Sequence, residues 1–207
     1  MDYITVSKQA EDMFEEKRSK FIGSIAPVEN EKQALEFIDS IKSKNPQARH
    51  VVYAYILREN NTMRYSDAGE PSGTGGQPVL NVLQKEGVTD VCVTVTRYFG
   101  GILLGAGGLT RAYAKGAKIA LDAAGKAEMR YCKVYEVTCS YPLYQKLLSA
   151  LEREDCFVGD TTFGEFVSFR MSAIEENCKK LLETIREVSA GKAISREIDE
   201  KYIKFDI

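Results

Sequence analysis

The sequence predicts an α+β protein of two domains, residues 1–133 and 134–207. Before residue 134, strands and helices surround two glycine-rich segments. From residue 134 onward, the apolar pattern predicts the order β-α-β-β-α-β, and no low-complexity linker separates the two parts. A length of 207 residues and a hydrophobic content of 44% are sufficient for a buried core.

Three strands and three helices are expected in the first domain. Leu35, Ile38 and Ile41 share one face of the first helix, while Gly87 and Gly125 end the other two helices. The strand of residues 91–99 is rich in β-branched side chains. The predicted strands are residues 20–28, 51–57 and 91–99, and the predicted helices are residues 31–44, 78–86 and 109–124.

The second domain has the element order of a ferredoxin-like split βαβ unit. Gly164 and Glu165 form the expected hairpin turn, and Gly191 ends the second helix. The predicted strands are residues 134–140, 156–163, 166–172 and 193–205, with helices at residues 143–154 and 175–189.

The two glycine-rich segments, residues 66–78 and 97–111, hold more than half of the sixteen glycines. Each leads into a predicted helix, so each is expected to present backbone N–H groups where an anion is favoured. Nucleotide motifs fit poorly, because no Gly-Lys-Ser/Thr follows and neither Gly-x-Gly is completed by a third glycine. A general anion site remains, and we expect no cofactor.

Basic residues are concentrated near the second segment. Residues 91–133 contain seven Lys or Arg against two Asp or Glu, whereas residues 134–207 contain ten against fourteen. A polyanion should therefore meet the first domain. Arg111, Lys115 and Lys118 share one stripe of a helix with Asp122, and the alternative is an ordinary solvated face. A second stripe, suited to close packing, consists of Ala112, Gly116, Ala120 and Ala124.

Arg97 is predicted on the same face of its strand as Val91, Val93 and Val95. An unpaired cation there is costly. Arg97 is therefore expected either to pair with Asp67 or Glu70 or to contact a ligand, and both alternatives remain open.

Other groups allow only a limited range of chemistry. A hydrolase or transferase needs a nucleophile beside a base. The candidates are His50, Asp67, Glu70, Ser72 and Thr74, and the same residues are assigned as secondary contacts of the anion site. Ser72 lies outside a Gly-x-Ser-x-Gly turn, so we assign no catalytic residue. Five cysteines without Cys-x-x-Cys and a single histidine favour neither a disulfide framework nor a metal site. With no apolar targeting segment, a cytoplasmic protein is expected, without a membrane partner.

Two long motifs resemble the signature of the YigZ/IMPACT family. They are residues 67–78 (DAGEPSGTGGQP) and 95–113 (VTRYFGGILLGAGGLTRAY), and residues 48–55 (ARHVVYAY) resemble the family's histidine-containing strand. The resemblance implies a ribosomal-protein-S5 domain-2-like first domain, a ferredoxin-like second domain and a role associated with RNA or the ribosome, since eukaryotic relatives act in translational control. Ala68 and Gln77 depart from the family's usual acidic and basic residues.

The leading hypothesis is a binding protein that contacts RNA phosphates and regulates translation. Tyr98 or Tyr113 would stack on a base. The remaining contacts are assigned to Arg97, Gly100, Gly101, Gly105, Gly107, Gly108, Arg111 and Lys115. The alternatives are an enzyme for a small phosphorylated or acyl substrate between the two glycine loops, and a purely structural role for the glycines. The expected partners are RNA or the ribosome, or a small anionic ligand.

Overall fold

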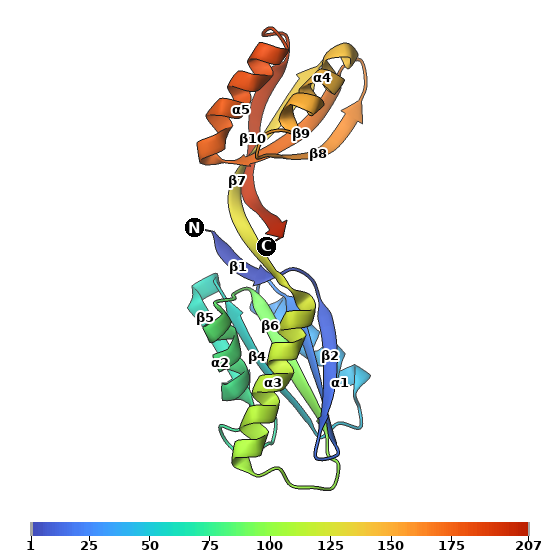
Figure 1. Ribbon diagram of the computed structural model, residues 1–207, viewed down its shortest axis with the longest axis vertical. Coiled ribbons are helices and arrows are strands. Elements are labelled where there is room, and N and C mark those ends of the chain that lie inside the picture. The colour runs from blue at the N-terminus through green and yellow to red at the C-terminus, as the bar shows by residue number, and fades with distance from the viewer. Residues whose placement is uncertain (1, 207) are drawn as a thin grey trace. The chain divides into compact units, whose positions relative to one another are not determined.

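The computed structural model describes residues 2–206 and contains two compact units (Figure 1). The N-terminal unit comprises residues 3–128 with 205–206, and the C-terminal unit comprises residues 129–204 with residue 2. Both contain helices and antiparallel strand pairs, so the two-domain α+β class is confirmed. The units divide within one strand, and the domain boundary at residue 134 stays a prediction.

A five-stranded antiparallel sheet forms the centre of the N-terminal unit. Its order is β2 (Ala10–Glu16), β3 (Ser19–Pro27), β6 (Val91–Tyr98), β4 (His50–Leu57) and β5 (Thr62–Ser66). The three central strands agree with the sequence prediction to within one residue at each end. The edge strands β2 and β5 were not predicted, nor were β1 (Tyr3–Val6) and the short 3₁₀ helix η1 (Glu59–Asn61).

Helices cover both faces of this sheet (Figure 1). One face packs against α1 (Glu31–Lys44), which begins where the Asn30 side chain accepts a hydrogen bond from the backbone N–H of Gln33. The other face packs against α2 (Gly76–Glu86) and α3 (Ala106–Ala124). Both of these helices start two or three residues earlier than predicted, because Gly75 and Gly105 serve as their N-caps.

The stripe of small residues on α3 packs closely on the sheet, as predicted. Its members are buried, and Gly116 faces Gly23 of β3. A Cβ atom added to Gly23 would lie 2.0 Å from the carbonyl oxygen of Gly116. Glycine is therefore required where α3 approaches the sheet.

The C-terminal unit has the predicted β-α-β-β-α-β order. Its sheet has the order β7, β9, β8, and both β10 and β1 pair with β7. Both helices pack on the same face of the sheet, where Leu147 and Leu181 meet Val137 and Phe169. The elements are β7 (Lys126–Cys139), α4 (Tyr141–Leu151), β8 (Phe157–Phe163), β9 (Val167–Ile174), α5 (Glu175–Val188) and β10 (Ile194–Asp206).

The strand β7 begins eight residues before its predicted start, because charged residues interrupt the apolar pattern in its first half. No helix in residues 2–206 combines the length and the apolar character that crossing a membrane requires.

Candidate anion-binding site

Four connections meet at one end of the N-terminal sheet, which we call the loop end: residues 17–18, 45–49, 67–75 and 99–105. Strand register places them together, because His50 at the start of β4 pairs with Arg97 at the end of β6. On the other side of β6, Tyr98 pairs with Lys20 at the start of β3. Both glycine-rich segments therefore lie at the same end of the sheet.

The first glycine-rich segment is organised by Asp67. One carboxylate oxygen accepts hydrogen bonds from the backbone N–H groups of Gly75 and Gly76 at 2.9 and 2.8 Å, and the other accepts from Gly73 at 2.8 Å. Sequence analysis predicted a free anion site at the start of this helix. That expectation was wrong for α2, because the chain's own carboxylate occupies the amides at its start.

These hydrogen bonds also determine the acidity of Asp67. Partial burial acts to raise the pKa of its carboxyl group, but the three N–H donors stabilise the ionised form. Their combined effect is larger, and the pKa of Asp67 lies below its ordinary value. Asp67 is therefore a charged structural group at neutral pH.

Arg97 forms a buried ion pair with Glu70 across the two segments. Its Nη1 donates to Oε1 of Glu70 at 2.8 Å, and the Tyr113 hydroxyl donates to the same oxygen at 2.6 Å. Burial raises the pKa of Tyr113, and the hydrogen bond to Glu70 raises it further. Arg97 Nε is buried without a hydrogen-bond partner among the described residues. Of the two alternatives for Arg97, the structure shows the ion pair, with Glu70 rather than Asp67.

Tyr113 is fully buried, so it is not available to stack on a base, contrary to one expectation. Tyr98 is half-buried, and its hydroxyl donates to the Asn45 side chain at 2.8 Å. Stacking on Tyr98 stays a prediction.

At the second glycine-rich segment, the backbone N–H groups that start α3 are not capped by a side chain of the described residues. Gly105 adopts a positive φ of 72° as the N-cap of α3. Gly100 packs against the β2–β3 turn, where an added Cβ would lie 1.9 Å from the Arg18 carbonyl oxygen. Gly101 and Gly107 are exposed, while Gly108 is half-buried.

The predicted basic stripe on α3 divides into two parts. Lys118 pairs with Asp122 and, at 3.4 Å, with Glu86. Neither Arg111 nor Lys115 has a carboxylate within 4.0 Å in residues 2–206, although the Lys115 ammonium lies 4.3 Å from the centre of the Phe14 ring. The two cations nearest the start of α3 are thus the ones without an ion pair.

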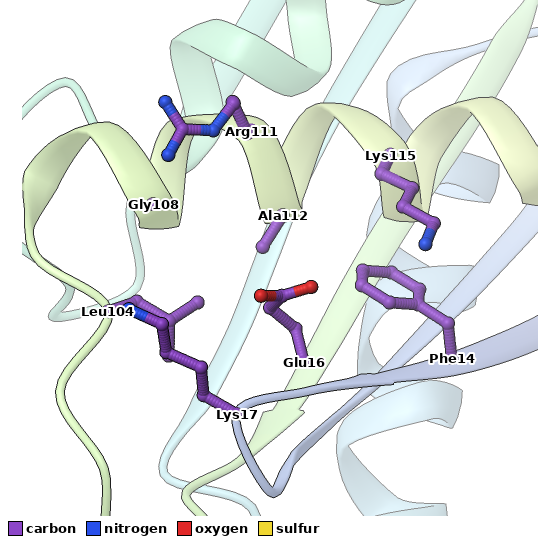
Figure 2. A pocket seen from close by; sticks show the side chains of 8 residues that line it. All are labelled: Phe14, Glu16, Lys17, Leu104, Gly108, Arg111, Ala112 and Lys115. Carbon is purple, nitrogen blue, oxygen red and sulfur yellow. The ribbon is translucent and has the colours of Figure 1, made fainter.

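Arg111 and Lys115 line a pocket of about 220 Å³ between α3 and the end of β2 (Figure 2). In Figure 2 the Glu16 carboxylate lies below α3, between the side chains of Lys17 and Phe14. The remaining lining residues are Leu104, Gly108 and Ala112. Sequence analysis missed Phe14, Glu16 and Lys17, because β2 carries no recognisable motif.

Two of the other candidate residues form hydrogen bonds with backbone carbonyl groups. His50 Nδ1 donates to the carbonyl oxygen of Ala68 at 3.0 Å, and the Thr74 hydroxyl donates to the carbonyl oxygen of Pro71 at 2.7 Å. Ser72 is exposed. Within residues 2–206, no hydrogen bond links His50 to a serine or threonine hydroxyl. The same part of the chain contains no cluster of three or more His, Cys, Asp or Glu placed to hold a metal ion.

The fold and loops define a two-domain α+β protein whose N-terminal unit presents two glycine-rich segments at one end of an antiparallel sheet. The sequence profile of the Impact N-terminal domain matches residues 17–121, and that of a domain of unknown function (DUF1949) matches residues 137–192. The chain therefore belongs to the IMPACT family.

Two bacterial relatives match nearly the whole chain. The IMPACT family member YvyE of Bacillus subtilis is 34% identical over 203 residues, covering 98% of this chain and 94% of that protein. The IMPACT family member YigZ of Escherichia coli is 30% identical over 187 residues, covering 89% and 92%. A crystal structure of a hypothetical protein, 27% identical, covers 96% of this chain and 98% of its own with a TM-score of 0.61.

Proposed function

We propose that this protein binds RNA or the ribosome through the loop end of its N-terminal unit and acts in translational regulation. Backbone N–H groups of residues 100–108, with Arg111 and Lys115, would contact phosphate groups. Arg97 would position the loops through its ion pair with Glu70. The chain belongs to the IMPACT family, and the resemblance to this family implies a role in translational control. This membership supports the proposed function.

The strongest support for this proposal is the excess of positive charge at the loop end. Six cations without an ion pair in the described chain lie on its connections or beside them: Lys17, Arg18, Lys44, Arg49, Arg111 and Lys115. Two of its acidic groups are already satisfied, because the buried Glu70 pairs with Arg97 and the half-buried Asp67 binds backbone amides. The exposed carboxylates of Glu15 and Glu16 lie beside residues 17–18, so the six cations outnumber them. Exposed cations that remain unneutralised in one region favour a polyanionic partner.

A titration with structured and single-stranded RNA across salt concentrations tests the proposal. If phosphate contacts dominate, the logarithm of the association constant should fall linearly with the logarithm of salt concentration. Replacing both Arg111 and Lys115 by glutamine should lower affinity and reduce the slope by about 1–2, since each lost phosphate contact reduces it by roughly 0.7–0.9.

The matched control replaces Lys32 and Lys85 by glutamine, because both are exposed and lie outside the loop end. This control removes the same charge and should change the slope less. Absence of RNA binding at low salt, or equal effects of the two double variants, would contradict the proposed function.

We infer an S5 domain-2-like fold for the N-terminal domain and a ferredoxin-like fold for the C-terminal domain, supported by their strand orders. We place the domain boundary between residues 133 and 134 and the protein in the cytoplasm.

A further inference from the structure

The pocket between β2 and α3 is lined by charged side chains that form no ion pair in the described chain. Lys17, Arg111 and Lys115 line it together with a single carboxylate, Glu16, and none of the four forms an ion pair within 4.0 Å in residues 2–206. Three cations and one carboxylate give the pocket a formal charge of +2. Such a concentration of charge in a concave site favours an anion of matching charge.

The phosphomonoester is the common biological anion that matches this charge. It carries about −1.5 to −2 at neutral pH and offers three strong acceptor oxygens. A phosphodiester within a nucleic-acid chain carries only −1. The guanidinium of Arg111 can bind two phosphate oxygens side by side, whereas Lys17 and Lys115 act as point charges. The pocket is therefore better matched to a terminal phosphate than to an internal one.

The remaining surface of the pocket suits the rest of a nucleotide. Figure 2 shows the Glu16 carboxylate below α3, and carboxylate oxygens can accept hydrogen bonds from ribose hydroxyl groups. Phe14, Leu104 and Ala112 contribute apolar surface beside it. The volume of about 220 Å³ lies below the usual range of roughly 300–1,000 Å³ for small-molecule sites, so the pocket suits the phosphate and ribose of a nucleotide rather than a larger ligand.

We propose that this pocket binds the 5′-phosphomonoester and ribose of a terminal nucleotide. Lys17, Arg111 and Lys115 hold the phosphate, and Glu16 accepts hydrogen bonds from the ribose hydroxyls. This inference rests on the proposed function, since it assigns a particular part of RNA to the same basic residues. A free nucleoside 5′-monophosphate carries the same groups and is the other source of this ligand.

The test uses the full chain and three probes: a short RNA with a 5′-phosphate, the same RNA with a 5′-hydroxyl, and free adenosine 5′-monophosphate. The 5′-phosphorylated RNA should bind about tenfold more tightly than the 5′-hydroxyl RNA, a difference of about 1.4 kcal/mol. Lys17→Gln should abolish this preference. Lys85→Gln, which removes an exposed lysine in the last turn of α2, should retain it.

Glu16→Ala separates ribose recognition from simple charge. If Glu16 accepts hydrogen bonds from ribose, its loss weakens binding of adenosine 5′-monophosphate although a negative charge has been removed. Stronger binding of this nucleotide by the Glu16→Ala variant would overturn the assignment of Glu16. Circular dichroism of each variant verifies that the fold is retained.

The outcomes distinguish this inference from the proposed function. Equal affinity for both RNAs, lowered in parallel by the Arg111/Lys115 double variant, overturns the pocket assignment and leaves RNA binding intact. Binding of free adenosine 5′-monophosphate without binding of either RNA supports the pocket and overturns the RNA role. Binding of none of the three probes overturns both.

Discussion

Replacing Arg97 by glutamine tests whether the buried ion pair stabilises the N-terminal unit. The side chains of Arg97 and Glu70 are only 7% and 4% exposed, and their charged atoms are 2.8 Å apart. In the variant, the buried carboxylate of Glu70 retains the hydrogen bond from the Tyr113 hydroxyl but loses its cationic partner. Removing one partner of a buried pair costs about 3–5 kcal/mol, against about 0–1 kcal/mol for an exposed pair. We expect Arg97→Gln to lose about 3–5 kcal/mol of unfolding free energy.

Calorimetry and circular dichroism of the full chain measure this loss. For a protein of this size, 1 kcal/mol changes the melting temperature by about 2–4 °C, so the expected decrease is about 6–20 °C. Lys42→Gln is the matched control, because it breaks the exposed 3.2 Å pair with Asp39 in the same unit. Its expected cost is below about 1 kcal/mol.

A third variant tests the physical cause of the loss. Replacing Arg97 by methionine, Glu70 by leucine and Tyr113 by phenylalanine removes both charges and the hydroxyl together. Buried ion pairs replaced by apolar residues of similar size often keep or gain stability, so this variant should be more stable than Arg97→Gln. Equal losses of stability in Arg97→Gln and Lys42→Gln, or a triple variant that is the least stable of the three, would refute a stabilising role for the buried ion pair.

Two further predictions concern the loop end and the domain boundary. Asp67→Asn should cost about 1–3 kcal/mol at neutral pH, because an amide cannot accept all three backbone hydrogen bonds. The folded pKa of Asp67 is lowered, so its contribution is complete above the unfolded pKa of about 3.9 and is lost as pH falls through the folded value. Urea unfolding of both proteins should therefore converge in acid, and a constant difference would reject the ionised carboxylate as the cause. A fragment of residues 127–207 should unfold cooperatively by circular dichroism, and a disordered fragment would reject the boundary at residue 134.

Local sequence patterns were sufficient for the central elements of the fold. Strands β3, β4 and β6 are covered by helices on both faces, so they appear as apolar, β-branched runs. The edge strand β2 has the sequence AEDMFEE and buries little of its surface, so its pattern resembles a loop. The edge strand β5 is missed for the same reason. A central strand that is buried on both faces therefore has a recognisable apolar sequence, whereas an edge strand that stays largely exposed does not.

The sequence by itself determined the α+β class, the packing stripe of α3 and the family, and it singled out the two glycine-rich segments as candidates for a site. Only the tertiary structure distinguished those segments, because Asp67 occupies the amides that start α2 whereas α3 has no capping side chain. It also selected Glu70 as the partner of Arg97 and brought Lys17 to the pocket beside Arg111. Periodicity records which face of an element is buried. Which side chains meet depends on strand register and helix packing between segments far apart in the sequence, and no local pattern contains that information.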